Sequence, residues 1–346
     1  MLILEFAVGL AILIIVHELG HFLACRLFKI PVDEFGLGIP PRVATLFEWG
    51  GTKFTLNAIP LGGFVRPRGE SNPEIADGLM AANPWKRIGV YLAGPLMNIL
   101  AAIFLYTAII MRLGMEDPER LDVVMISRVE AGSPAETAGL LVGDIILKAQ
   151  DEPIDSTEKL RDIVYQNLGQ AIKIEYQRGE MVASTTLPLR VKPPEGQGPM
   201  GIQMGPPTRP VSFFVALPAG VVATYRHSEA LLSMLTNLVR GENNNQGRLL
   251  GFKGMVDTYS DIRAGDSPTG LPQEVDILGF FTSLTISLGL LNLVPIPALD
   301  GGRIFLALPE IILRRRIPTR TQEVLIGVTF VLLLSLLILV NVMEFF

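Results

Sequence analysis

The chain alternates between long apolar segments and regions of mixed polarity. Four apolar segments stand out, at about residues 2–25, 88–111, 277–299 and 323–343. Each is close to the roughly 20 residues that a helix rising 1.5 Å per residue needs to cross about 30 Å of hydrocarbon. The pattern therefore predicts a polytopic α-helical membrane protein with four transmembrane helices.

Composition supports a membrane protein and excludes several other classes. Of the 346 residues, 49% are hydrophobic and 18% charged, and the mean hydropathy is +0.42. The net charge of -5 and the absence of a long basic run exclude a nucleic-acid partner. The single cysteine, Cys25, excludes intramolecular disulfides and cysteine-based zinc ribbons. A cleaved signal peptide is the alternative for residues 2–25, but no basic residue precedes that segment.

Basic residues in the connecting loops predict the orientation. Lysines and arginines gather between the first two apolar segments and again between the last two, where Arg314, Arg315 and Arg316 are consecutive. Such loops are expected on the cytoplasmic side. Counting crossings then places the N-terminus, residues 113–275 and the C-terminus on the outer side.

The long outer region is expected to hold a separate small domain. Residues 121–192 alternate β-rich runs with the amphipathic stretch "STEKLRDIVYQNLG". The stretch "AGSPAETAGLLVGDIILKAQDEPI" resembles a PDZ domain of the circularly permuted bacterial kind. The predicted division is a first half of the membrane core at 1–112, the PDZ domain at 120–193, a linker and membrane-surface segment at 194–275, and the second half of the core at 276–346.

Residues 211–240 allow two interpretations. They are apolar, but Pro218 interrupts them and Arg226, His227 and Glu229 lie among them. A fifth span would break the orientation that the loop charges predict. An amphipathic helix on the outer membrane surface fits better, because it leaves the number of crossings unchanged.

The first apolar segment carries three ionisable residues, His17, Glu18 and His21, within "HELGH". Each such residue costs about 2.5 to 3.5 kcal/mol in a membrane span, so a functional reason is expected. Residues at i and i+4 project from one helix face, and His-Glu-x-x-His on a helix is typical of zinc hydrolases whose glutamate is the general base. The spacing predicts a zinc site at His17 and His21, with Glu18 as the base.

A catalytic zinc usually has three protein ligands, so a third residue is needed. Cys25 is eight residues from His17, about 12 Å along a helix, which is too far for a shared tetrahedron. His227 is predicted on the outer side. Asp300, in "LLNLVPIPALDGGRIF", follows two prolines that interrupt the third span in the inner half of the bilayer. "PALDGG" alone is also typical of a loop turn, but its depth matches that of "HELGH".

"HELGHF", "LNLVPIPALDGG" and a PDZ domain between spans together resemble the site-2 proteases, and most of all the bacterial regulator of sigma-E protease group. The resemblance implies Zn²⁺ held by His17, His21 and Asp300, with Glu18 activating water for peptide-bond hydrolysis inside the membrane. It also implies four transmembrane helices, a membrane-associated β-hairpin and an inserted extracytoplasmic PDZ domain (α+β). The expected location is the bacterial cytoplasmic (inner) membrane, with the active site in the cytoplasmic half of the bilayer.

Two further segments match this family. The stretch "KFTLNAIPLGGFVRP" predicts a β-hairpin closed by its double glycine, and it matches a β-loop thought to pair with an extended substrate. "AGPLMNIL" in the second span also matches, and its Asn98 is expected to be structural, bonding across helices. Substrate binding is expected at Asn57, Gly62, Gly63, Phe64, Asn292, Pro295 and Pro297.

The resemblance implies a single-span membrane protein as substrate, for instance an anti-sigma factor, already cut on the outer side by a first protease. Membrane lipids are the other expected partners. The best-known relatives carry two PDZ domains, whereas one is found here. Two alternatives remain: a metal transporter using the same residues as a transit site, and a non-proteolytic PDZ scaffold. Neither needs Glu18 as a base.

Overall fold

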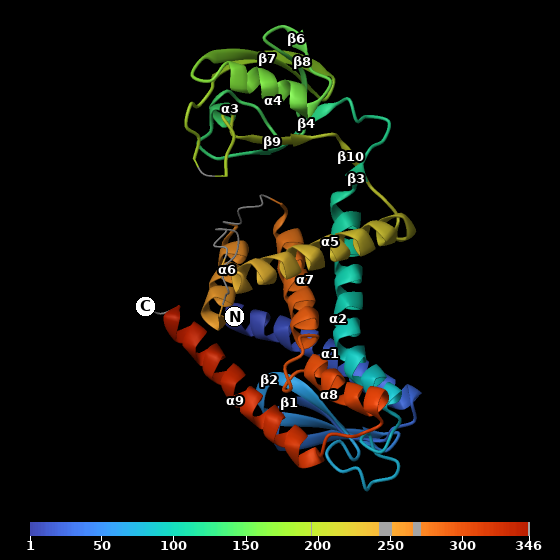
Figure 1. The fold of residues 1–346 in the computed structure, drawn as a ribbon. Helices are drawn as coiled ribbons and strands as arrows, with labels where there is room; N and C mark the ends of the chain where they lie inside the picture. Colours follow the sequence, from blue (N-terminus) through green and yellow to red (C-terminus); the bar gives the residue numbers. More distant parts are fainter. Residues whose placement is uncertain (195, 242–250, 266–270, 345–346) are drawn as a thin grey trace. The chain divides into compact units, whose positions relative to one another are not determined.

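A computed structural model describes the chain except for residues 195, 242–250, 266–270 and 345–346 (Figure 1). Some of these fall in the predicted linker and surface segment, 194–275, which is therefore described in part. The chain forms two compact units. One combines Met1–Ile109 with Leu217–Phe346, and the other is Ile110–Ala216.

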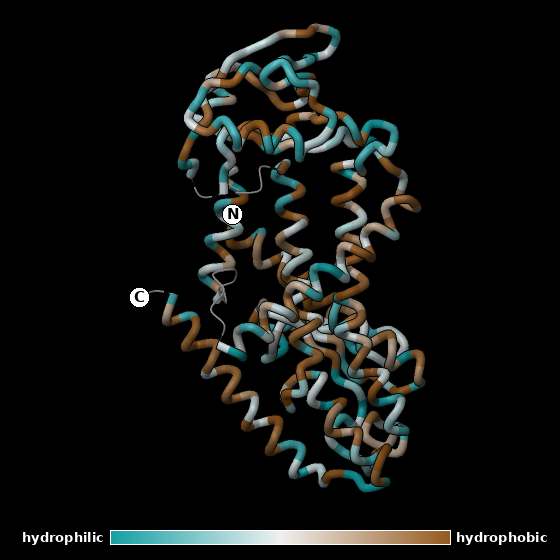
Figure 2. Tube along the Cα trace, turned by 45° about the horizontal axis from the view of Figure 1, so that its top comes forward, coloured by the Kyte–Doolittle hydropathy of each residue, from teal (hydrophilic) through white to brown (hydrophobic). Residues whose placement is uncertain are grey.

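Four helices in the described part of the chain are long and apolar enough to cross a membrane, as predicted. Figure 2 shows hydrophobic residues along most of α9. The third span is shorter than expected, because the proline-containing segment after Asn292 cannot continue a helix. The four helices are α1 (Leu2–Leu27), α2 (Pro84–Leu113), α7 (Gln273–Asn292) and α9 (Thr319–Met343).

Three more helices belong mainly to the same unit: α5 (Phe213–Val239), α6 (Phe252–Ala264) and α8 (Asp300–Leu313). Residues 211–240 are thus largely helical, and α5 is not among the candidate spans. Its place on a membrane surface stays a prediction. His227 on α5 lies 2.5 Å from the Tyr106 hydroxyl and 3.4 Å from that of Ser283, so it joins α5 to α2 and α7.

Two long strands, β1 (Val32–Trp49) and β2 (Thr52–Pro67), follow α1. The turn between them is Gly50-Gly51, whose φ angles of +59° and +79° suit a two-residue hairpin turn. The predicted turn at Gly62 and Gly63 is wrong, because both glycines lie inside β2. A double glycine accommodates an irregularity within a strand as readily as a turn, and the register shifts there.

The pairing of β1 and β2 is not that of a simple hairpin. Residues 34–37 of β1 have two partners each, one within 53–56 and one within 63–66 of β2. Segment 63–66 therefore lies beside β1 on the side opposite segment 53–56. β2 also packs against α1, which brings segment 63–66 close to the helix that carries the "HELGH" residues.

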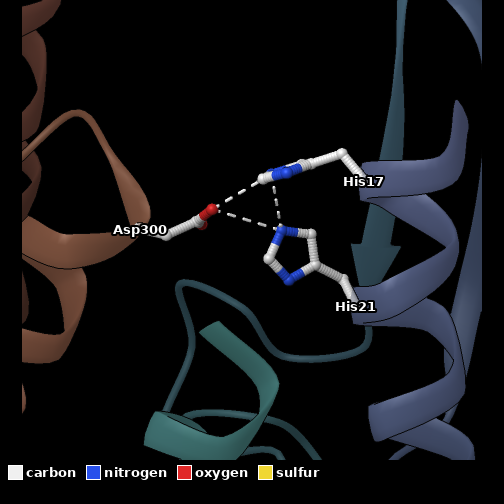
Figure 3. A group of neighbouring side chains, drawn as sticks. All are labelled: His17, His21 and Asp300. Atoms are coloured by element: carbon white, nitrogen blue, oxygen red, sulfur yellow. Dashed lines mark hydrogen bonds and ion pairs between the residues drawn. The ribbon is translucent and has the colours of Figure 1, made fainter. Parts of the chain in front are cut away.

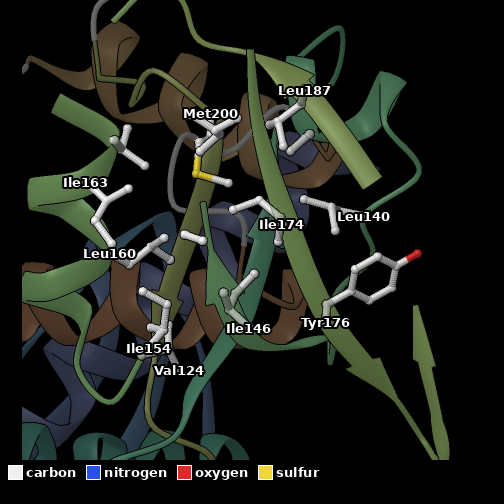
Figure 4. Close-up of a cluster of buried hydrophobic side chains, with 14 of the residues drawn as sticks. Val124, Leu140, Ile146, Ile154, Leu160, Ile163, Ile174, Tyr176, Leu187 and Met200 are labelled. Carbon is white, nitrogen blue, oxygen red and sulfur yellow. The ribbon is translucent and has the colours of Figure 1, made fainter. Parts of the chain in front are cut away.

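The second unit is a small domain of strands and short helices. Its elements are β4 (Val124–Val129), α3 (Pro134–Thr137), β5 (Ile145–Ala149), β6 (Glu152–Pro153), α4 (Thr157–Gln166), β7 (Ala171–Arg178), β8 (Met181–Pro188) and β9 (Ile202–Gly205). The sheet has the strand order β8-β7-β5-β4-β9, and β6 pairs with β5. Its core contains aliphatic side chains from the strands and α4 (Figure 4). In the same unit, β3 (Met115–Glu116) pairs with β10 (Thr208–Arg209).

The boundaries of this domain differ from those predicted. The sequence placed its end at residue 193 and a linker after it, but β9 pairs with β4 and so belongs to the sheet. Proline and glycine in "VKPPEGQGPMGIQMG" are typical of a linker, whereas the pairing depends on a strand about 75 residues earlier. The compact unit extends to Ala216.

Candidate metal centre

Three predicted ligands converge on one point, although 283 residues separate the first from the last (Figure 3). His17 and His21 lie one turn apart on α1, and Asp300 is the first residue of α8. The two Nε2 atoms are 3.2 Å apart. Oδ2 of Asp300 lies 3.1 Å from His17 Nε2 and 3.4 Å from His21 Nε2. Over the described residues, this is the one such group whose geometry could hold a metal ion.

These distances fit a tetrahedral ion. Two donor atoms that each lie 2.0 to 2.1 Å from a tetrahedral zinc are about 3.3 to 3.4 Å apart. The three observed separations, 3.1, 3.2 and 3.4 Å, are close to such edges. If zinc is bound, two imidazoles and one carboxylate would leave one position open for water or substrate, as in catalytic rather than structural sites.

Helix α2 contacts both imidazole rings. Nδ1 of His21 lies 2.8 Å from the carbonyl oxygen of Val90 and donates its hydrogen to it, which leaves the Nε2 lone pair free for a metal. Nδ1 of His17 lies 3.1 Å from the side-chain amide of Asn98. The second helix therefore orients the ligands that the first helix carries.

Gly94 lets α2 approach this closely. A Cβ atom at Gly94 would collide with His21 Nε2 and lie 2.8 Å from His17 Cε1. Real Cβ atoms do not tolerate such contacts, so a side chain here must displace the imidazoles or the helix. The absence of a side chain at this position is thus part of how the site is built.

Gly94→Ala is expected to lower zinc affinity by at least about tenfold, because the added methyl group displaces the ligand rings. Gly279→Ala on α7 is the matched control, since its Cβ would meet no atom of the described residues within 4 Å. The measurement is chelator competition on both purified variants. Equal zinc affinities would show that the close approach does not constrain the ligands.

Glu18 lies beside the ligands. Its Oε2 accepts a hydrogen bond of 2.9 Å from the backbone N–H of Val65 in β2. Glu18, the three ligands and Val65 line one cavity of about 500 Å³. A carboxylate fixed at this place is suited to exchange protons with a water molecule on the open side of the metal.

The cavity lining combines apolar side chains with polar and charged ones. Ile14 and Leu288 are among the apolar residues, and Glu70, Tyr91 and Arg303 are among the polar and charged ones. Arg303 forms an ion pair with Glu70 and lies over the Tyr91 ring, 5.7 Å from its centre. Burial favours the neutral form of Arg303, but Glu70 and Tyr91 outweigh it and raise its pKa above the ordinary value. The guanidinium is therefore charged at any physiological pH.

Sequence reasoning missed Glu70 and Arg303. The position of Arg303, three residues after Asp300 at the start of a helix, was an available signal, because residues i and i+3 share a helix face. Glu70 offered no such signal, since its place depends on how the loop after β2 folds back. The contacts of the Val65 N–H with Glu18 and of the Val90 carbonyl with His21 could not be predicted from the sequence either, because backbone groups are the same in every residue type.

The predicted substrate-binding residues fall into two groups. Phe64 and Asn292 line the cavity. Gly63 does not line it but is close by, since its Cβ would lie 3.5 Å from Cγ of Glu18.

The second group lies away from the cavity. Asn57 is buried in the sheet, where its Nδ2 donates to the Gly38 carbonyl at 3.1 Å. Gly62, Pro295 and Pro297 are also outside the residues that line the cavity, and the substrate roles of the whole set stay predictions.

A triad that could hold a metal ion, with an adjacent carboxylate and set among helices that can span a membrane, is typical of a membrane-bound metal-dependent hydrolase. Comparison with known proteins gives the family. The chain belongs to peptidase family M50, the site-2 proteases, whose profile matches residues 5–336. It is therefore a metallopeptidase, and the resemblance seen in its motifs is confirmed.

Relatives match over nearly the full length. A Clostridium perfringens protein, whose name describes it provisionally as a zinc metalloprotease, is 30% identical over 96% of this chain and 95% of its own. The chloroplastic membrane metalloprotease ARASP of Arabidopsis thaliana is 28% identical over 98% of this chain and 78% of its own. The PDZ domain of an SdrC-like protein from Listeria monocytogenes is 24% identical and covers 24% of this chain and 87% of that structure, with a TM-score of 0.22.

Proposed function

We propose that this chain is an intramembrane zinc metalloprotease that hydrolyses peptide bonds within the transmembrane segments of single-span proteins. The observation that carries the proposal is the triad of His17, His21 and Asp300, whose donor atoms lie 3.1 to 3.4 Å apart. His17 and His21 lie on α1, a helix that is long and apolar enough to span a membrane. A peptide bond that reaches it is thus expected to come from another span.

Zinc is the proposed metal, and this donor set fits it. Two neutral imidazoles and a carboxylate in tetrahedral arrangement are typical of zinc hydrolases. A zinc ion held by His17 Nε2, His21 Nε2 and Asp300 Oδ2 supplies Lewis-acid activation of water and of the scissile carbonyl.

Glu18 is the proposed general base. Its carboxylate takes a proton from the attacking water and later gives a proton to the nitrogen of the leaving amine. The hydrogen bond from Val65 N–H holds one carboxylate oxygen, Oε2, at 2.9 Å and leaves the other for the proton. Strand β2 thereby fixes the orientation of the base.

The substrate is proposed to bind as an extended strand beside β2. A helical peptide bond hides its carbonyl, so a transmembrane helix has to unwind before water can attack it. Segment 63–66 pairs with β1 on one side. Its Val65 N–H is already bonded to Glu18, so the substrate strand is proposed to use other backbone groups of this segment. Strand addition to such an edge gives backbone hydrogen bonds that do not depend on the substrate's sequence. Asn57, Gly62, Phe64, Asn292, Pro295 and Pro297 are proposed to support this binding region.

The biological setting follows from the same proposal. The basic loops favour a site in the cytoplasmic half of the bacterial inner membrane, with the PDZ-like domain on the outer side. A substrate already trimmed on the outer side, such as an anti-sigma factor, is proposed to enter between the spans. Its cytoplasmic fragment is then released as the signal.

Removal and return of zinc tests the function. The purified chain, reconstituted in lipid vesicles with a single-span substrate, is expected to cut within the span, to lose this activity with a chelator, and to regain it with zinc. Mass spectrometry of the fragments locates the cut. Zinc passing across the vesicle membrane without any cleavage would favour the transporter and contradict the protease. Zinc binding with neither transport nor cleavage would favour the scaffold.

A further inference from the structure

The side chain of Asn98 is an unusual feature beside the metal centre. It lies on α2, is fully buried, and its Nδ2 is 3.1 Å from Nδ1 of His17. Its other amide atom, Oδ1, has no hydrogen-bond partner among the described residues. A buried amide that lacks a partner costs about 1 to 3 kcal/mol, so a compensating role is expected.

The tautomer of His17, that is, which ring nitrogen carries the hydrogen, decides how this amide has to be oriented. A neutral imidazole carries its hydrogen on one nitrogen and a lone pair on the other. Nε2 of His17 faces Asp300 and His21 and needs its lone pair to serve as a ligand. The hydrogen is then on Nδ1, and the amide NH₂ of Asn98 would bring a second donor against it.

A rotation of the amide by 180° removes this conflict. The oxygen and nitrogen of a carboxamide have nearly the same size and exchange places in such a rotation. Oδ1 then lies about 3.1 Å from His17 Nδ1 and accepts its hydrogen. In the orientation of the structure, Oδ1 has no partner among the described residues. The contact of the amide with His17 therefore decides between the two orientations.

The two histidines differ in how their outer nitrogens are held. His21 donates to a backbone carbonyl, that of Val90, which no substitution removes. His17 has Asn98 as the partner of its Nδ1 within the described structure, and that partner is a side chain. The orientation of the His21 ring is therefore set by the backbone of α2, whereas that of the His17 ring is set by one side chain that a substitution can replace.

We propose that Asn98 is a positioning residue for the metal centre. Its Oδ1 accepts the hydrogen of His17 Nδ1, and this bond fixes the tautomer and ring orientation that bring Nε2 to the metal. Partners of this kind raise ligand basicity, and their loss typically costs about 10- to 100-fold in metal affinity. The inference rests on the metal centre of the proposed function, and it adds a role to the structural one expected from the sequence.

Two substitutions separate this role from simple packing. Asn98→Leu keeps the size of the side chain but removes the acceptor, and zinc affinity is expected to fall about 10- to 100-fold. Asn98→Asp presents acceptor atoms alone, and zinc affinity is expected to equal or exceed that of the wild type. Both are measured by chelator competition on the detergent-purified full chain, with the visible spectrum of the cobalt-substituted protein as a second readout of ligand geometry.

Thr107→Val is the matched control. Thr107 is also buried on α2, but its hydroxyl donates to Ile103 of the same helix, and position 107 is nine residues from Asn98. This variant is expected to bind zinc like the wild type. An equal loss of affinity in Thr107→Val and Asn98→Leu would overturn the proposal, because the effect would then belong to any buried polar group on α2.

Two other outcomes would also overturn it. Wild-type zinc affinity in Asn98→Leu would show that His17 needs no acceptor, and a loss in Asn98→Asp as large as in Asn98→Leu would show that the amide donates. If thermal unfolding shows that Asn98→Leu does not fold, Asn98→Ala removes the same acceptor without added bulk. A wild-type chain that binds zinc but cleaves nothing would contradict the protease and leave this inference intact.

Discussion

Glu18→Gln is expected to keep its zinc and lose cleavage of a single-span substrate by about 10²- to 10⁴-fold. Glutamine has the same shape, and its amide oxygen can still accept the hydrogen bond from Val65 N–H. It cannot take a proton from water, because the amide oxygen is a far weaker base than a carboxylate. Cleavage rate and zinc content are measured on the same preparation, so a folding defect is recognised by loss of the metal.

Glu74→Gln is the control for this substitution. Glu74 is exposed on the loop after β2, and its side chain is outside the cavity lining. It is expected to cleave and bind zinc like the wild type. If Glu18→Gln cleaves as fast as Glu74→Gln, the water is activated without Glu18, and its role as the base has to be abandoned.

Asp300→Asn is expected to lose both zinc and cleavage. The substitution keeps the shape but replaces a charged ligand oxygen with a neutral one, and it removes the carboxylate that lies against both imidazoles. The loss of zinc affinity is expected to exceed the roughly 10- to 100-fold that removal of a residue supporting a ligand costs. Chelator competition measures the affinity, and the cleavage assay is run with zinc in excess.

Asp77→Asn is the matched control, because it makes the same substitution at a carboxylate that is not a predicted metal ligand, in a surface ion pair. Asp77 is exposed and pairs with Arg68 at 3.2 Å, an arrangement worth about 0 to 1 kcal/mol at a surface. Zinc affinity is expected to be unchanged in this variant. Retention of wild-type affinity by Asp300→Asn would remove Asp300 from the ligand set and leave the third ligand to be found.

Glu18→Gln and Asp300→Asn together distinguish the protease from the transporter. In a protease, Glu18→Gln separates metal binding from cleavage, whereas Asp300→Asn abolishes both. In a transporter, Glu18→Gln has no cleavage to lose, and the effect of Asp300→Asn appears in the movement of zinc across vesicles. The pattern of losses therefore identifies the function more securely than either variant alone.

The sequence by itself determined the features that depend on near neighbours. The four spans follow from local hydropathy, and α1 places His17 and His21 on one face because residues four apart are adjacent on any helix. The interruption of the third span was predicted from prolines that cannot continue a helix, although the helix already ends at Asn292, earlier than expected. Glu18 was identifiable as a candidate base for the same reason, since it lies between the two histidines in the sequence.

The tertiary structure decided whatever depends on segments distant in the chain. The turn between β1 and β2 lies at Gly50-Gly51 and not at the predicted Gly62 and Gly63, because strand pairing rather than glycine content selects among possible turns. Strand pairing also explains why β9 belongs to the sheet and not to the predicted linker, since it pairs with β4. The Val65 N–H and the Asn98 amide reach the site because α1 packs against β2 and α2. A bond of Asn98 across helices was expected from its motif, but its partner, His17, is set by the packing of whole elements, as is the contact of Val65 with Glu18.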